Sequence, residues 1–166
     1  IETPFYYVSL ANFKLNNSND VTEIRDLILS TGAKLVVIDA LAPVMDGDEN
    51  SKEDVQPVMN ALRKLADQTG AALVIIHHNN KAGGYRGSSA IKGALDLMVT
   101  VKQDGDSNVL IFSSEKNRDG LYTNWAGVAT WQNWDTPEET FTMRPFTLRE
   151  KDKQQPASVR YIVGLV

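Results

Sequence analysis

The chain has 166 residues, of which 42% are hydrophobic and 23% are charged, so it can bury one core but is short for two. It contains no cysteine, which excludes a disulfide framework and a thiolate zinc site. The formal net charge of −4 argues against bulk coating of nucleic acid, although a local basic loop could still bind it. Nothing resembles a signal peptide or a membrane span, so we expect a soluble, cytoplasmic protein.

The chain begins in an apolar stretch. Its first residue is Ile1 rather than methionine, and we interpret the chain as a fragment or a processed product. Residues 5–10 are predicted to form a strand. Asp20 is then predicted to cap a helix that Gly32 ends, because apolar residues follow Asp20 at helical spacing.

Two short apolar runs indicate a parallel sheet. Residues 35–38 and 73–76 are uninterrupted, which is typical of central strands that are covered on both faces. Between them, a helix that is predicted to end at Gly70 begins at Ser51 or Asp54 as its cap. We favour Asp54, because this start leaves Pro57 in the first turn, where its missing N–H has no partner to lose. The alternation predicts an α/β domain with a mainly parallel sheet, flanking helices and right-handed crossovers.

The pattern changes in the second half of the chain. Residues 97–101 and 109–112 are apolar runs on either side of an Asp-Gly-Asp turn and predict a hairpin. From Leu121 onward, tryptophans, prolines and alternating polar residues indicate irregular antiparallel strands. We expect one partial domain over residues 1–150, whose parallel sheet continues into antiparallel strands, and a tail or terminal strand over residues 151–166.

Polar residues directly follow both parallel runs. Asp39 ends the first run and His77-His78 end the second, and the carboxyl ends of parallel strands form the ligand crevice of an open α/β sheet. An acid at this place in a nucleotide hydrolase holds Mg²⁺ through water. Alternatively, Asp39 only caps the next turn and the histidines are ordinary hydrogen-bond partners. Period-two alternation lets at most one histidine face a ligand together with Asp39.

The segment from Asn79 to Ser89 has features of a nucleic-acid contact. Arg86 can meet a phosphate, Tyr85 can stack on a base, and Ser88 can cap a short helix that carries Lys92. The alternative is an ordinary solvated loop.

Residues 115–120 carry two cations that are two positions apart. In an extended segment, Lys116 and Arg118 project to the same side and could clamp one phosphate. The alternative is a charged turn.

The segment Asp46-Gly47-Asp48-Glu49-Asn50 is similar to the start of a calcium-binding loop. It lacks the required glycine and glutamate, since Ser51 and Pro57 stand at those positions. We interpret it as a polar loop.

Taken in order, these segments resemble the RecA-like ATPases of the DnaB and RepA type, the hexameric replicative helicases and their phage and plasmid relatives. The resemblance covers residues 34–120, about half of the chain. Residues 35–39 look like the Walker B strand, which makes Asp39 the acid that organises Mg²⁺. Residues 74–78 look like the strand that ends in the sensor of the γ-phosphate, with His78 at the sensor's position.

The resemblance also implies a nucleic-acid site and a subunit contact. The segment from Arg86 to Lys92, with Gly87, Ser88 and Ser89, is similar to the motif that binds single-stranded nucleic acid near the central channel. Residues 115–120 look like the place from which Lys116 and Arg118 reach the nucleotide of a neighbouring subunit.

Two departures from the family pattern limit what the chain could do alone. The sequence contains no G-x-x-x-x-G-K-[ST] phosphate loop, and no counterpart of the family's catalytic glutamate precedes Asp39. The resemblance therefore implies part of a Mg²⁺-dependent ATP hydrolase of the P-loop class that acts in DNA replication on single-stranded DNA. Its parent is a homo-oligomer, expected to be a hexameric ring without a membrane partner, and the fragment alone is expected to be inactive.

Two other functions stay open from the residues alone. One is a non-catalytic module that keeps the RecA fold for oligomerisation or DNA contact. The other is a metallohydrolase built from acidic and histidine side chains: Asp39, Asp46, Asp48, His77 and His78.

Overall fold

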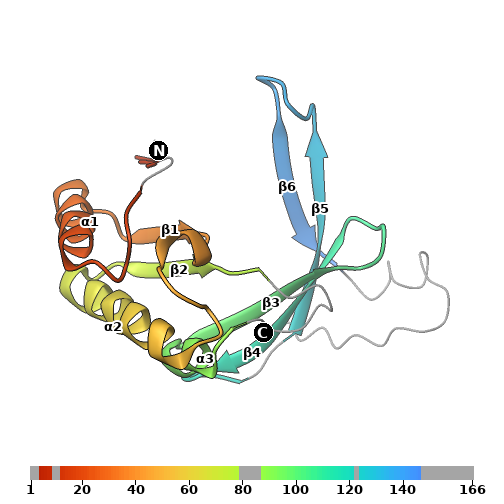
Figure 1. Cartoon of the computed structure of the whole chain (residues 1–166). Coiled ribbons are helices and arrows are strands. Elements are labelled where there is room, and N and C mark those ends of the chain that lie inside the picture. The colour runs from red at the N-terminus through yellow and green to blue at the C-terminus, as the bar shows by residue number, and fades with distance from the viewer. Residues whose placement is uncertain (1–3, 9–11, 79–86, 122–123, 147–166) are drawn as a thin grey trace. The chain divides into compact units, whose positions relative to one another are not determined.

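The computed structural model describes residues 4–8, 12–78, 87–121 and 124–146. The chain divides into two compact units, Ile1–Ala94 and Leu95–Val166, and each is described by itself (Figure 1). None of the helices in the described ranges is long and apolar enough to cross a membrane.

The first unit alternates helices and strands. Its elements in chain order are α1 (Ser18–Thr31), β1 (Leu35–Asp39), the 3-10 helix η1 (Ala42–Val44), α2 (Lys52–Thr69), β2 (Ala72–Ile76) and α3 (Ser89–Ala94). The strands β1 and β2 pair in parallel, from Leu35 opposite Ala72 to Asp39 opposite Ile76. The predicted strand–helix–strand order and the parallel pairing are confirmed.

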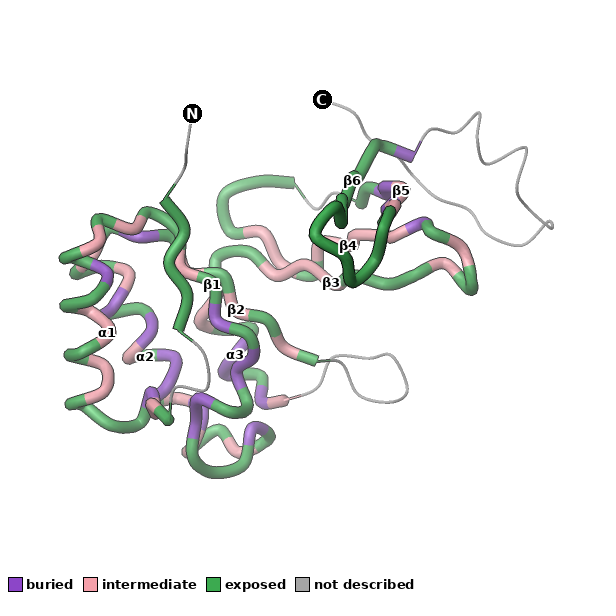
Figure 2. Tube along the Cα trace, turned by 90° about the horizontal axis from the view of Figure 1, so that it is seen from above, coloured by how far each residue is buried: buried purple, intermediate pink, exposed green. Residues whose placement is uncertain are grey.

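The two helices α1 and α2 pack on one face of the β1–β2 sheet. Ile28, Leu65 and Ala71 form a buried cluster there, and Val36 and Leu73 pack against it from the strands. Figure 2 colours the buried parts of α2 purple. The opposite face is exposed within the part of this unit that the structure describes, with side chains 39% to 58% exposed: Leu35, Val37, Val74 and Ile76. The prediction that both faces are covered is wrong for these residues, because both helices lie on the same side.

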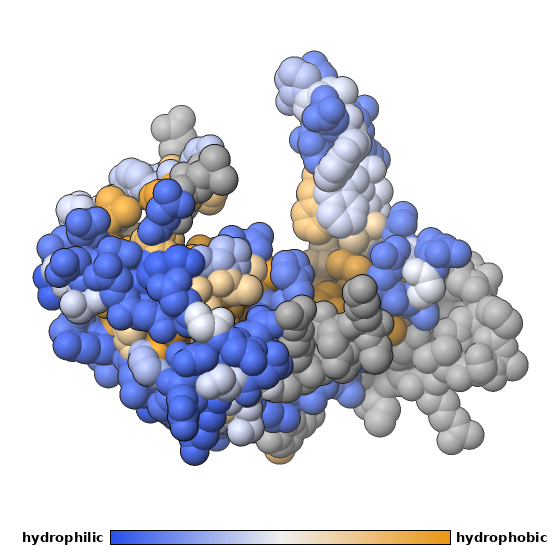
Figure 3. Space-filling model, viewed as in Figure 1, coloured by the Kyte–Doolittle hydropathy of each residue, from blue (hydrophilic) through white to orange (hydrophobic). Residues whose placement is uncertain are grey.

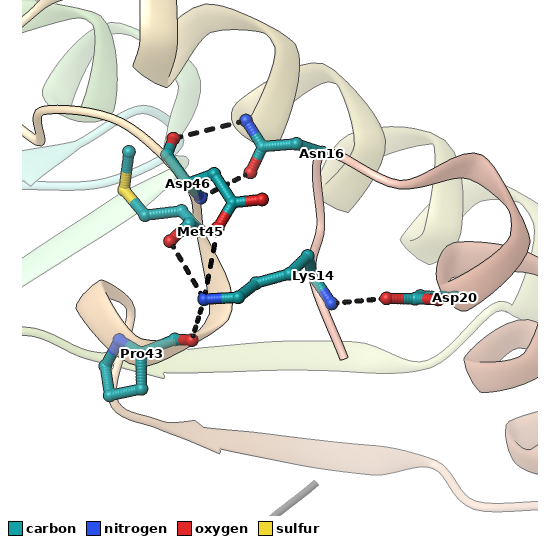
Figure 4. Close-up of polar contacts among 6 residues, drawn as sticks. All are labelled: Lys14, Asn16, Asp20, Pro43, Met45 and Asp46. Atoms are coloured by element: carbon teal, nitrogen blue, oxygen red, sulfur yellow. Dashed lines mark hydrogen bonds and ion pairs between the residues drawn. The ribbon is translucent and has the colours of Figure 1, made fainter. Parts of the chain in front are cut away.

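The start of α1 differs from the prediction by three residues. Asn17 is the N-cap, and its side-chain oxygen accepts from the Asn19 N–H at 2.9 Å. Asp20 lies in the first turn instead, where its carboxylate accepts from the Lys14 N–H at 2.6 Å (Figure 4). Asp20 therefore does not cap the helix, because its carboxylate binds the segment that precedes it.

The start of α2 also lies earlier than predicted. Ser51 is the N-cap and its hydroxyl accepts from the Asp54 N–H at 3.3 Å, so Pro57 lies inside the helix. The missing proline N–H would have bonded the Glu53 carbonyl, and Glu53 is exposed to solvent that can replace the bond. The Asp54 carboxylate accepts from the Asp48 N–H at 2.9 Å. Both predicted helix ends, Gly32 and Gly70, are confirmed in the left-handed conformation.

The second unit is a four-stranded antiparallel sheet with the order β3-β4-β5-β6. Its strands are β3 (Leu97–Gln103), β4 (Val109–Asn117), β5 (Asn124–Gln132) and β6 (Thr140–Pro145). Val109, Ala126 and Phe146 form its buried cluster, with Val128 packed against them. The predicted hairpin and the antiparallel strands after it are confirmed, and so is the α/β class with parallel strands followed by antiparallel ones.

The predicted strand over residues 5–10 is not observed where the structure describes it. Residues 4–8 have no regular structure, and the side chains of Phe5 and Tyr7 are 88% and 76% exposed. A strand needs a hydrogen-bonded neighbour, and none of the described strands pairs with this segment.

Candidate nucleotide and nucleic-acid sites

Asp39 and the two histidines lie at the same edge of the parallel sheet. Asp39 closes β1 opposite Ile76, the last residue of β2, and His77 and His78 follow directly. The chain after Asp39 is fixed there by the Leu41 N–H, which donates to the Ile76 carbonyl at 3.0 Å. The side chains of Asp39 and His78 are exposed, so both can reach a ligand.

His77 differs from His78 in its surroundings, as the alternation of a strand predicts. Its side chain is 15% exposed, and its Nδ1 lies 4.0 Å from Oε2 of Glu49. Glu49 is buried, and a glutamate is almost never fully buried unless it is paired, as Glu49 is here with His77. Sequence reasoning placed Glu49 only in a polar loop, because no local pattern links it to a histidine 28 positions later.

Gly87 and Ser88 are held against the same loop. The Ser88 N–H donates to the Glu49 carbonyl at 2.8 Å, and the Ser88 hydroxyl accepts from the Ala90 N–H at 3.2 Å at the start of α3. Gly87 has φ +107, and a Cβ there would lie 3.2 Å from the Glu49 carbonyl oxygen and 3.3 Å from His77 Nε2. The predicted capping role of Ser88 is confirmed. His77 and Ser88 both lie next to Glu49, His77 at its carboxylate and Ser88 at its backbone carbonyl.

Ser89 and Lys92 were also predicted to contact nucleic acid, and both are exposed on α3. Arg86 lies outside the described residues. Ser89 lines a shallow hollow of about 330 Å³ together with Lys52 and Arg63 of α2, and a guanidinium N–H of Arg63 donates to the Ala94 carbonyl at 2.9 Å. Lys92 lies on the same short helix. Sequence reasoning missed Lys52 and Arg63, although their separation of eleven residues places them on one helix face.

In the second unit, Lys116 and Arg118 lie on either side of Asn117, the last residue of β4. Lys116 is half-buried within the strand, opposite Met98, whereas Arg118 lies just beyond it and is exposed. The Arg118 guanidinium lies 2.8 Å from the Asp96 carboxylate, and the Arg118 N–H donates to the Asp96 carbonyl at 2.9 Å.

The acidic loop between η1 and α2 makes polar contacts within itself and with other segments of the first unit. The Asp48 carboxylate accepts from the Asn50 N–H and from its side-chain amide, and Asp46 pairs with Lys14 at 3.3 Å. Within the described ranges, no group of three or more histidine, cysteine or acidic side chains could hold a metal ion. This finding does not support the metallohydrolase alternative.

Comparisons with known proteins found a matching family model and a similar curated protein. Residues 6–84 match a family model described as an AAA domain. The DNA repair protein RadA of Salmonella typhimurium is 26% identical over 114 residues, which cover 66% of this chain and 25% of that protein. The chain therefore spans about a quarter of the length of this curated relative.

Solved structures show the same fold. One solved ATPase domain has a TM-score of 0.55 at 14% identity, covering 65% of this chain and 47% of that chain. A DnaB-like replicative helicase, solved for its interactions with primase, has a TM-score of 0.53 at 15% identity, covering 65% and 32%. These likenesses confirm the predicted fold.

Proposed function

We propose, from the premise that this chain is a RecA-like ATPase of the DnaB and RepA type, that it is part of an ATP-dependent motor on single-stranded DNA. The observation that carries the proposal is the parallel register of β1 and β2, which brings Asp39 beside the His77–His78 turn. This carboxyl edge is where open α/β sheets bind their ligands.

Asp39 is proposed to organise Mg²⁺ through water, and His78 to detect the γ-phosphate. One exposed carboxylate at a strand end suits a cation that keeps most of its water and takes its other ligands from phosphates. When bound, the ion supplies neutralising charge to the phosphates. His78 is exposed next to β2 and can donate an N–H to a phosphate oxygen. Phosphoryl transfer needs mainly such positioning and charge neutralisation.

The phosphate-cradling loop is not among these 166 residues, and we assign it to the parent protein. Its backbone N–H groups and lysine would supply most contacts to the phosphates. The chain alone is therefore proposed not to turn over ATP.

The start of α3 is proposed to bind single-stranded DNA through Arg86, Gly87, Ser88, Ser89 and Lys92. Lys52 and Arg63 support this assignment, because they add positive charge to the hollow that Ser89 lines. The link from His77 through Glu49 to Ser88 offers a path by which the nucleotide edge and this motif could be coupled.

Lys116 and Arg118 are proposed to act on the nucleotide of a neighbouring subunit in a homo-oligomeric, hexameric ring. Arg118 is exposed beyond the end of β4, and a cation supplied by a neighbour stabilises charge that develops on the γ-phosphate.

The central test is Asp39→Asn in the parent protein. Steady phosphate release with Mg²⁺ and single-stranded DNA should fall by at least about 100-fold, the scale of losing one electrostatic group at a transition state, while DNA binding persists. Asp67→Asn, which removes an exposed acid on α2, is the matched control and should change nothing. A parent that binds DNA but releases no phosphate before any substitution would instead indicate a non-catalytic RecA-fold module.

A further inference from the structure

The β5–β6 ribbon extends beyond the rest of its sheet. β5 pairs with β4 only from Asn124 to Val128, whereas its pairing with β6 runs from Gly127 to Gln132. In the described sheet, the outer half of β5 therefore pairs with β6 and not with β4 (Figure 1). A two-stranded ribbon is marginally stable in water, so its side chains must stabilise it or serve another purpose.

Three aromatic rings gather at the outer end of this ribbon. Trp131 lies directly opposite Phe141, with ring centroids 4.6 Å apart, and this cross-strand pair stabilises the ribbon. Trp134, in the loop, meets Trp131 edge to face with centroids 6.4 Å apart. Trp134 is not part of the cross-strand pair and is 70% exposed, while Trp131 and Phe141 are about half exposed. Ribbon stability alone does not explain Trp134.

The loop that carries Trp134 has a fixed shape. The Thr136 N–H donates to the Asn133 carbonyl at 3.2 Å, and the Glu139 N–H donates to the Thr136 carbonyl at 3.0 Å. The Asn133 side-chain amide closes the loop by donating to the Glu138 carbonyl at 3.2 Å. The exposed indole is therefore presented on an ordered turn, which lowers the entropy cost of binding.

The same end of the ribbon is acidic. The segment from Asn124 to Met143 contains Asp135, Glu138 and Glu139 and neither lysine nor arginine. All three carboxylates are exposed and lie in the same loop between β5 and β6 as Trp134. Figure 3 shows the outer end of the ribbon as mostly hydrophilic. Their charge repels phosphate and attracts cations, and the face of an indole also attracts an ammonium or guanidinium group. The surface therefore selects against nucleic acid.

We infer that the outer end of the β5–β6 ribbon, formed by Trp131, Trp134, Phe141, Asp135, Glu138 and Glu139, binds an arginine- or lysine-bearing segment of a protein partner. The cationic head group lies over the Trp134 face and pairs with the neighbouring carboxylates. The residues of this surface are distinct from those of the proposed nucleotide and DNA sites.

The test uses the whole 166-residue chain and a synthetic peptide in which arginine alternates with serine. Binding is followed by tryptophan fluorescence and by calorimetry, with a glutamine-for-arginine peptide as the uncharged probe. The arginine peptide should bind, and its affinity should fall as salt is added. The glutamine peptide should bind much more weakly. Trp134→Ala should lower the affinity for the arginine peptide about 2- to 30-fold, the range expected for loss of a cation–π contact.

A second variant combines Glu138→Gln with Glu139→Gln. It keeps the shape of the loop, because the side-chain oxygen of glutamine can still accept the hydrogen bond that the Asp135 N–H donates to Glu139. This variant should have a lower affinity for the arginine peptide, and that affinity should depend less on salt. Tyr7→Ala and Glu23→Gln remove an exposed aromatic and an exposed acid in the first unit and should leave binding unchanged.

Three results would overturn the inference. The first is no binding of the arginine peptide, or equal binding of the glutamine peptide. The second is unchanged affinity in both ribbon variants, which would place the peptide elsewhere on an acidic chain. The third is binding of a single-stranded oligonucleotide that Trp134→Ala abolishes, because the aromatic surface would then stack on bases.

Discussion

Arg118 and Asp96 are joined twice, by an ion pair of 2.8 Å between their side chains and by a hydrogen bond of 2.9 Å from the Arg118 N–H to the Asp96 carbonyl. The backbone bond fixes where the arginine leaves the sheet. The side-chain pair is weak by comparison, since Arg118 is 48% and Asp96 73% exposed, and exposed pairs contribute about 0 to 1 kcal/mol. The guanidinium can therefore be redirected to a phosphate at little cost.

Arg118→Ala in the assembled parent protein should lower ATP turnover by about 10³ to 10⁵, because an arginine supplied to a neighbour's phosphate stabilises the transition state. Nucleotide affinity should stay within a fewfold. Steady-state phosphate release and nucleotide titration measure the two effects separately.

Mixing Arg118→Ala with Asp39→Asn subunits should restore some turnover, because some interfaces then combine an intact Arg118 with an intact Asp39. Asp96→Asn is the matched control. It keeps the hydrogen bond from the Arg118 N–H to the backbone carbonyl of residue 96, and it should lower turnover only slightly. Normal turnover of Arg118→Ala in an assembled ring would show that residues 115–120 are an ordinary charged turn.

Arg86→Ala with Lys92→Ala in the parent should weaken single-stranded DNA binding and flatten its dependence on salt by roughly one phosphate contact per cation removed. Stimulation of ATP hydrolysis by DNA should fall as well. A salt titration of DNA affinity measures the slope, and Lys34→Ala, an exposed cation before β1, is the control. An unchanged slope in the double variant would move the DNA site away from α3.

The elements of the fold that were predictable are those with a strong local signal. The apolar runs at 35–38 and 73–76 became β1 and β2, and glycines marked both helix ends. The helix starts were not predictable, because several capping residues stand side by side before each helix. Hydrogen bonds to the segment just before each helix decide between them: Asp20 binds the Lys14 N–H and Asp54 binds the Asp48 N–H, which leaves the caps to Asn17 and Ser51.

The candidate site was predictable in its strand-end residues but not in their supports. Asp39 and His78 stand out because polar residues follow apolar runs. Glu49 carries no such signal, since its role depends on His77 and Ser88, which only the folded chain brings near. The Arg118–Asp96 pair likewise depends on the β3–β4 register, which shifts between Met98 and Val99.

The 166-residue chain alone should release no phosphate from ATP in the presence of Mg²⁺ and single-stranded DNA. Its sequence lacks the phosphate loop, which would supply most contacts to the nucleotide. A coupled phosphate assay measures the rate, with the parent protein as the positive control. A steady rate of about 1 s⁻¹, ordinary for an enzyme, would mean that the active site lies elsewhere in this chain.

Gly87→Ala should destabilise the start of α3, because Gly87 has φ +107 and a Cβ there would lie 2.9 Å from Ile91 Cδ1 and 3.2 Å from the Glu49 carbonyl oxygen. Such a backbone conformation costs an ordinary residue about 1 to 3 kcal/mol. The neighbouring carbonyl belongs to the backbone that holds Ser88, so relief of the contact would also loosen that hydrogen bond. Urea unfolding of the chain should show the loss, and DNA affinity of the parent should fall with it.

Gly93→Ala is the matched control for this prediction. Gly93 lies on the same short helix, and a Cβ there would meet nothing within 4 Å. Alanine favours a helix over glycine by about 0.5 to 1 kcal/mol, so Gly93→Ala should leave stability unchanged or raise it slightly. Equal unfolding free energies for the two variants would mean that the contact of Gly87 with Glu49 does not hold the motif, and that α3 is positioned by its buried residues Ala90 and Ile91 alone.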